Sequence, residues 1–211
     1  MARLDWSAIG ERYYETGIDQ GVLYVGEDGI AWPGLISVTE SPSGGDAKPF
    51  YLDGIKYLNI AAAEEFEATI NAFFAPAEFN ACDGTVSVHN GLFATQQPRK
   101  PFGLSYRTRV GNDIDGADHA YKIHLVYNAL SAPTDRENST LNDSIDPAQY
   151  SWAITTTPPM GSGVKPTAHF VIDSRFADPT LLASVEDILY GNEVGSSRLP
   201  SVTELIDLFN G

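Results

Sequence analysis

FGLSYRTRV (residues 102–110) and HAYKIHLVYN (residues 119–128) carry the strongest structural signal in this chain. In each stretch, bulky or apolar residues alternate with smaller or polar ones, which is the period of a β-strand with one buried face. The intervening GNDIDGAD (residues 111–118) is rich in turn-forming residues. The three stretches together predict an antiparallel hairpin, with Lys122 and His124 on its solvent-facing side.

The same period of two recurs outward from this hairpin. It predicts strands at residues 21–25, 30–32, 34–40, 55–61, 66–74, 150–155 and 168–172. Helical spacing appears only near the end, where Asp178 and Ser201 are candidate N-caps and Gly191 is a candidate stop. We therefore predict a mainly β protein, an antiparallel β-sandwich or barrel with one or two helices, the clearest near the C-terminus.

The length of 211 residues favours one domain. Residues 1–20 carry aromatic residues without a regular period, and we interpret them as an N-terminal arm. Residues 21–211 are then a single β domain. Two stretches within it, residues 40–53 and 131–147, lack a strand pattern and are interpreted as long loops.

The charge balance excludes several function classes. The chain has 28 acidic and 13 basic residues and a formal net charge of −15. Such a chain repels polyphosphates, which excludes ordinary nucleic-acid binding and binding to a membrane through a basic patch. The single cysteine fits a reducing compartment, and neither a signal peptide nor an apolar run of spanning length is evident. We expect a soluble protein without a membrane partner.

The sequence predicts no metal site. In the turn that contains Asp113, Asp115 and Asp118, aligning Gly116 with the central glycine of an EF-hand places Gly111 and Lys122 at the outer ligand positions, where carboxylates are needed. A solvated turn is the favoured interpretation, although an opportunistic cation there stays open. The four histidines are scattered, and those at 119 and 124 fall on opposite faces of one predicted strand.

No catalytic residue or cofactor-binding motif is predicted either. Cys82 lies beside Asp83 and near Glu78, which would raise the pKa of its thiol, so a packed cysteine is expected. The glycine patterns of nucleotide-binding loops and the nucleophile elbow of hydrolases are missing from the sequence. We therefore expect that the protein is not an enzyme.

Several segments, taken in order, resemble a known family. They are GERYYETGIDQGVLY (10–24), SPSGGDAKPFYLDGIKY (41–57), EEFEATI (64–70), QPRKPFGLSYRTR (97–109) and AYKIHLVY (120–127). In content and spacing these segments resemble the major tail tube proteins of long-tailed, siphovirus-type bacteriophages, particularly those of actinobacterial hosts. The resemblance covers most of residues 9–157 and is weaker in the C-terminal part.

The resemblance implies a structural subunit that forms hexameric rings, which stack into a hollow tube for genome ejection. Its implied partners are further copies of itself, the tape-measure protein, and the tail terminator and distal tail proteins, while DNA passes through without specific binding. The implied location is the virion tail, after assembly in the bacterial cytoplasm. The family has no catalytic residues or cofactors.

Two groups of residues are candidate assembly sites. The loop over 40–53 is a candidate ring-stacking element, with Pro42, Gly44, Gly45, Pro49, Phe50 and Tyr51 as its contact residues. The basic residues of the central segment are candidates for pairing with carboxylates of neighbouring subunits, namely Arg99, Lys100, Arg107 and Arg109. Because residues 1–85 carry 14 acidic and 4 basic side chains, we expect them to supply an acidic tube lumen.

Two other functions remain open at this stage. One is a carbohydrate-binding β-sandwich on a virion or bacterial surface, which would use exposed aromatic residues such as Trp32 or Tyr51, unless these fill the core. The other is a hydrolase with a jelly-roll cleft that no motif reveals.

Overall fold

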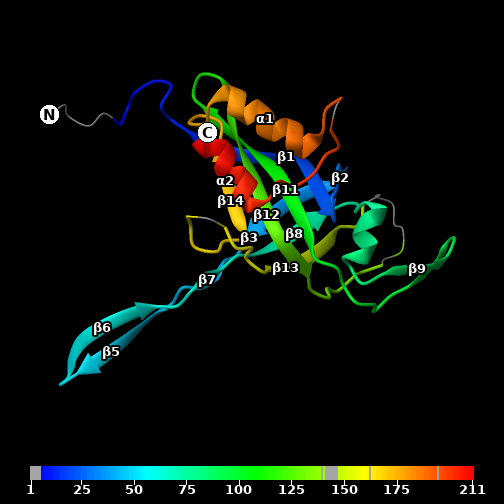
Figure 1. The fold of residues 1–211 in the computed structure, drawn as a ribbon, viewed down its shortest axis with the longest axis horizontal. Coiled ribbons are helices and arrows are strands. Elements are labelled where there is room, and N and C mark those ends of the chain that lie inside the picture. Colours follow the sequence, from blue (N-terminus) through cyan, green and yellow to red (C-terminus); the bar gives the residue numbers. More distant parts are fainter. Residues whose placement is uncertain (1–5, 139, 141–146, 162, 194) are drawn as a thin grey trace.

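The computed structural model describes residues 6–138, 140, 147–161, 163–193 and 195–211 (Figure 1). The chain is mainly β, as predicted, and every strand pair is antiparallel within the described residues. The strands are β1 Tyr14–Val25, β2 Asp28–Ala31, β3 Leu35–Glu40, β4 Ser43–Gly44, β5 Ala47–Leu52, β6 Ile55–Ala61, β7 Glu64–Glu65, β8 Glu67–Ala72, β9 Val86–His89, β10 Leu92–Ala94, β11 Phe102–Asn112, β12 Gly116–Ser131, β13 Tyr150–Thr156 and β14 His169–Asp173. The helices are a 3-10 turn η1 Ala77–Ala81, then α1 Pro179–Tyr190 and α2 Val202–Asn210.

The predicted central hairpin is confirmed as β11 and β12, which pair along most of their length. The main sheet has the order β2-β1-β11-β12-β13-β8-β3. One edge of β12 is shared by two strands, because residues 122–126 pair with β14 and residues 129–131 pair with β13. The sheet therefore divides along this edge, and its β13-β8-β3 part is free to curve away from β14.

The curved sheet encloses one of two hydrophobic cores. Although β3 ends the strand order, it contacts β1 near the opposite end, so the sheet bends round on itself. The rings of Trp32, Phe79 and Trp152 pack against one another in the enclosed space, with centroids 4.9 to 5.9 Å apart. This inner core also contains Leu104 and Val126 of the central hairpin.

The second core lies between the outer face of the sheet and the two helices. Ile123 and Leu125 of β12 pack there with Val185 and Leu189 of α1. The predicted caps are confirmed, since Asp178 accepts hydrogen bonds from the backbone nitrogens that open α1, and Ser201 does so for α2. The helices thus cover a sheet face that would otherwise be exposed.

The expectation of one buried and one solvent-facing side in β12 was wrong, because both sides are covered. Odd-numbered residues such as Leu125 face the helices, while even-numbered ones such as Val126 face the enclosed core. His124, expected on the surface, is therefore buried with 7% of its area exposed.

The loop expected over residues 40–53 is also corrected, since most of it is β-structure. Residues 47–52 form β5, which pairs with β6, and Ser43 and Gly44 pair with Glu65 and Glu64. Asp53 and Gly54 form the tip with positive φ values of 50° and 78°, which match the two-residue turn that Asp-Gly favours. The segment is a long hairpin that projects from the body of the molecule (Figure 1).

The two remaining expectations about organisation concern the N-terminal arm and the second long loop. Strand β1 begins at Tyr14, so the last part of the predicted arm 1–20 lies in the main sheet. Residues 1–5, and residues 139 and 141–146 of the predicted loop 131–147, lie outside the described residues. No helix among the described residues is long and apolar enough to span a membrane.

Candidate functional site: two exposed hairpins and a histidine cluster

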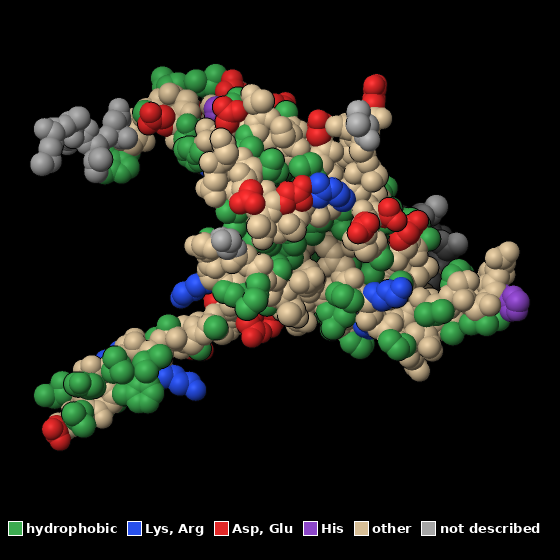
Figure 2. Space-filling view, viewed as in Figure 1, with side chains coloured by type: hydrophobic (Ala, Val, Ile, Leu, Met, Phe, Trp, Pro, Cys, Tyr) green, Lys and Arg blue, Asp and Glu red, His purple; other side chains and the backbone are tan. Residues whose placement is uncertain are grey.

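The β5–β6 hairpin exposes an apolar surface that none of the described residues covers. All residues of both strands are exposed to solvent. Large apolar side chains account for much of this surface, with 73% of Ile55 and 75% of Tyr57 accessible, and the rest of the group comprises Phe50, Tyr51, Leu52, Leu58 and Ile60. Figure 2 shows these side chains in green along the projecting arm. Exposed apolar patches of this extent mark interaction sites.

The base of the hairpin is held by polar contacts to the main sheet. The Ser43 hydroxyl donates to a Glu67 carboxylate oxygen at 2.7 Å, and the Ser41 backbone nitrogen donates to the Glu67 carbonyl. Beyond this stem, the two strands pair with each other, and all of their residues are exposed. Because an isolated two-stranded hairpin is marginally stable in water, a partner surface would order this one.

A second hairpin, β9–β10, projects from another side of the body (Figure 1). Its exposed residues include Val88, Leu92 and Phe93, each with at least half of its area accessible. The molecule therefore presents two separate apolar projections.

The predicted ring-stacking residues lie on or beside the first hairpin. Pro42 precedes the stem and Gly44 lies in it, while Gly45 has a positive φ of 73°. Pro49, Phe50 and Tyr51 lie in β5. A stacking role for these residues stays a prediction.

Three of the four predicted inter-subunit cations already have partners in the chain. Arg107 and Arg109 both donate to the carboxylate of Asp19, at 2.7 and 2.9 Å. Arg99 donates to the Ser131 hydroxyl and lies 3.4 Å from Asp83, while Lys100 is exposed. The Arg107 guanidinium holds the pKa of the Asp19 carboxyl below its usual range. Pairing of these cations with a neighbouring subunit stays a prediction. Because three of the four have partners within the chain, fewer cations are available for such contacts than the sequence suggested.

Two further sequence-based candidates lie apart from these surfaces. Cys82 is fully buried, and desolvation raises the pKa of its thiol to about 11, in keeping with a packed cysteine. In the turn after β11, Asp113 accepts from the Gly10 backbone nitrogen, while Asp115 pairs with His119 and Asp118 with Arg109. These carboxylates therefore point to different partners.

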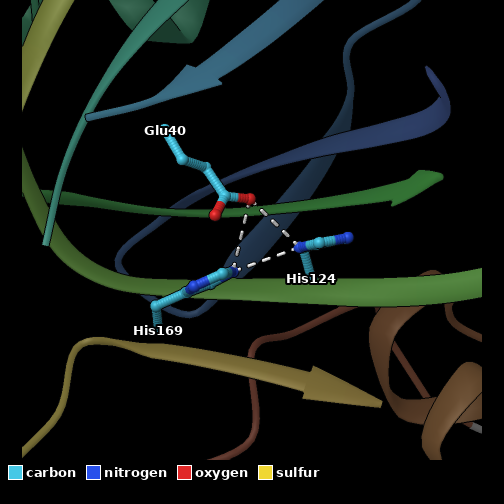
Figure 3. Close-up of side chains that lie close together, drawn as sticks. All are labelled: Glu40, His124 and His169. Atoms are coloured by element: carbon cyan, nitrogen blue, oxygen red, sulfur yellow. Dashed lines mark hydrogen bonds and ion pairs between the residues drawn. The ribbon is translucent and has the colours of Figure 1, made fainter. Parts of the chain in front are cut away.

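A cluster that the sequence did not predict lies inside the curved sheet (Figure 3). Among the described residues, Glu40, His124 and His169 form the one group of three potential metal ligands whose donor atoms lie within 4.8 Å of one another. Nδ1 of His124 lies 3.2 Å from Nε2 of His169 and 3.4 Å from Oε1 of Glu40. The distance from the His169 nitrogen to the same oxygen is 4.0 Å.

Aromatic and polar neighbours fix these three side chains. The Tyr106 ring stacks on His124 at 4.6 Å, and its hydroxyl donates to Glu40 Oε1 at 2.8 Å. The Phe66 ring lies 4.3 Å from His169. Desolvation lowers the pKa of both imidazoles, to about 4 for His124, so both rings are neutral at pH 7.

The cluster escaped the sequence analysis because its members come from three strands far apart in the chain. Glu40 ends β3, His124 lies in β12 and His169 opens β14. Residue spacing along the chain therefore does not predict the cluster. The three residues meet because the sheet divides beside β12, which brings β3 over the two histidines. The one available sequence signal was the presence of polar residues within otherwise alternating strands. These residues were interpreted as facing solvent.

No family model matches this chain, and no curated protein matches it. Solved structures similar to it include the anti-feeding prophage cap (AFP tube terminating cap), with a TM-score of 0.37 and 11% identity over 82% of this chain and 97% of that one. Another is the sheath/tube terminator of the extracellular contractile injection system PVC, with a TM-score of 0.34 and 14% identity over 81% and 99%. A third is the PVC sheath–tube complex, with a TM-score of 0.33 and 15% identity over 80% and 93%. All three TM-scores are below 0.5 and all three identities are below 25%, so these similarities assign no role to this chain.

Proposed function

We propose that this protein is a structural subunit of a phage-type tail tube, which assembles with further copies of itself as stacked hexameric rings. The β5–β6 hairpin carries this proposal, because it extends a largely apolar surface into solvent that the described part of the chain does not cover. The resemblance of the sequence to tail tube proteins supplies the kind of assembly. The proposal includes no catalytic activity.

A second copy of the chain is the proposed occupant of the hairpin surface. Residues 47–61 carry two lysines and one aspartate, whereas the whole chain has a net charge of −15. The hairpin is thus locally positive and apolar, and the body of another copy is acidic. A head-to-tail contact of this kind builds rings or filaments, as a tube requires.

One of the two aromatic residues named for the carbohydrate-binding alternative is not exposed in the structure. Trp32 is buried with 1% of its area exposed, and its indole nitrogen donates to the Phe74 carbonyl. It therefore fills the core. Tyr51 is exposed, but it lies on the hairpin among apolar neighbours.

Assembly can be tested by replacing two hairpin residues at once. We expect the unmodified chain to form rings or tubes at high concentration, measured by sedimentation velocity and electron micrographs. The double substitution Ile55→Ser with Tyr57→Ser should stay monomeric with an unchanged far-UV circular dichroism spectrum. Ile114→Ser, at a turn residue that is 64% exposed, is the matched control and should assemble normally. Monomers of the unmodified chain at every concentration and salt tested would contradict the proposal.

The lumen of such a tube is proposed to be acidic, so that DNA passes without binding. Phosphate contacts by Lys or Arg release counterions and hold DNA in place, which a conduit must avoid. Assembled tubes should therefore show no DNA affinity in a mobility-shift assay even at low salt. Salt-dependent binding by intact tubes would rule out the acidic lumen while leaving the assembly itself intact.

A further inference from the structure

We propose that Glu40, His124 and His169 form a binding site for a divalent transition-metal ion such as Zn²⁺. This inference stands independently of the proposed assembly. Two imidazole nitrogens and one carboxylate oxygen are a donor set that zinc sites use, with a fourth position left for water. The three side chains converge on one point from three strands (Figure 3).

The spacing of the donor atoms fits a tetrahedral ion. Zinc–nitrogen and zinc–oxygen bonds of about 2.1 Å place neighbouring ligand atoms about 3.4 Å apart in a tetrahedron. Two of the three distances here are 3.2 and 3.4 Å, and the third is 4.0 Å. A shift of about 0.6 Å by the Glu40 carboxylate toward His169 would complete the geometry, and this side chain is the most exposed of the three, at 39%.

The neighbours of the cluster are arranged as supports for metal ligands. With Nδ1 of His124 turned to the ion, its proton lies on Nε2, which is 3.1 Å from the Thr108 hydroxyl oxygen and can donate to it. The Tyr106 hydroxyl already donates to Glu40 Oε1 and orients the carboxylate. The two histidines are also nearly buried, with 9% and 14% of their side chains exposed, so they face the cluster rather than solvent.

A bound ion would connect parts of the sheet that backbone hydrogen bonds do not connect. Strand β3 pairs with β8, whereas His124 and His169 lie on the paired strands β12 and β14. The ion would therefore fasten β3 where it crosses the inner face, immediately before the stem of the projecting hairpin. The Tyr106 and Phe66 rings pack against the two imidazoles and would hold the site in place.

The test uses the full chain without a histidine tag and measures Zn²⁺ binding by calorimetry. Co²⁺ absorption in the visible range serves as a second probe, because it reports low-coordinate geometry. We expect one equivalent of metal per chain and a rise in melting temperature with Zn²⁺. Glu40→Gln and His169→Gln should each weaken binding at least tenfold and abolish the thermal shift. His89→Gln, at an exposed residue of β9, is the control and should bind as the unmodified chain does.

Other outcomes would overturn the proposal. These are no stoichiometric binding by the unmodified chain, unchanged binding in Glu40→Gln, or an equal loss in His89→Gln, which would indicate scattered surface histidines. Circular dichroism checks folding of each variant. If His169→Gln fails to fold, Glu40→Gln decides alone, because Gln has the shape of Glu and Glu40 is partly exposed.

Discussion

The β11–β12 and β5–β6 hairpins have the same local structure and opposite surroundings. Both are antiparallel pairs joined by turns that contain Asp and Gly, and both carry large apolar side chains. Much of β11 and β12 is buried on both sides, while every residue of β5 and β6 is exposed. A strand pattern in the sequence therefore predicts how the backbone pairs. It does not predict which layers of the fold cover the strand.

The largest expected effect is the difference between the two hairpins in how much a truncated side chain lowers the free energy of unfolding. Leu104→Ala in β11 removes a fully buried side chain from the inner core, and we expect it to lower the free energy of unfolding by about 2–5 kcal/mol. Leu58→Ala in β6 removes a side chain that is 47% exposed and should change it by less than about 0.5 kcal/mol. Urea denaturation of the monomer measures both. Similar losses in the two variants would break the comparison.

A smaller effect is expected at the charges that join β1 to β11. Asp19→Asn removes the carboxylate that Arg107 and Arg109 share, and we expect a loss of about 1–2 kcal/mol at pH 7, since the pair is partly exposed. The pKa of Asp19 is lowered in the folded state, so its contribution is present above the unfolded pKa and disappears as pH falls through the folded one. The two proteins should therefore converge in stability below pH 4. A constant difference from pH 7 to pH 2 would contradict this interpretation.

A further effect is expected at α1, the helix that covers β12 and, among the described residues, has no counterpart over the β5–β6 hairpin. Asp178→Ala removes the side chain that accepts from the Thr180 and Leu181 backbone nitrogens, and should cost about 1 kcal/mol. Asp178→Asn keeps an accepting oxygen and is expected to retain most of that stability. Thermal unfolding followed by circular dichroism compares the two. An equal loss in both variants would show that the cap does not act through this hydrogen bond.

The smallest effect on global stability is expected at the hairpin tip. Gly54→Ala places a Cβ at a φ of 78°, which strains the turn between β5 and β6. Because these strands bury little, global stability should fall by less than about 0.5 kcal/mol. Hydrogen exchange at β5 and β6 should nevertheless rise, while exchange at β11 and β12 stays unchanged. Faster exchange in both hairpins would show that the projection is coupled to the core.

The sequence was informative where signals are local. Alternation located β3, β6, β8, β11, β12, β13 and β14, and capping residues located both helices. The β5 strand was missed because Pro49 and nearby glycines resemble a loop, although Asp53-Gly54 followed by Ile55 is a hairpin signal. Of the candidate assembly residues, the aromatic ones on β5 are exposed as a contact role requires, but Arg107 and Arg109 pair within the chain.

The sequence alone determined the antiparallel strands, the two capped helices, the acidic charge and the buried cysteine. These follow from residue period, turn chemistry and composition, which act over a few neighbouring residues. Only the tertiary structure decided which faces are covered, because the helices cover one side of β12 and the curved sheet encloses the other. That enclosure is also what brings Glu40 from β3 to His124 and His169, since contacts between distant strands depend on the path of the whole sheet.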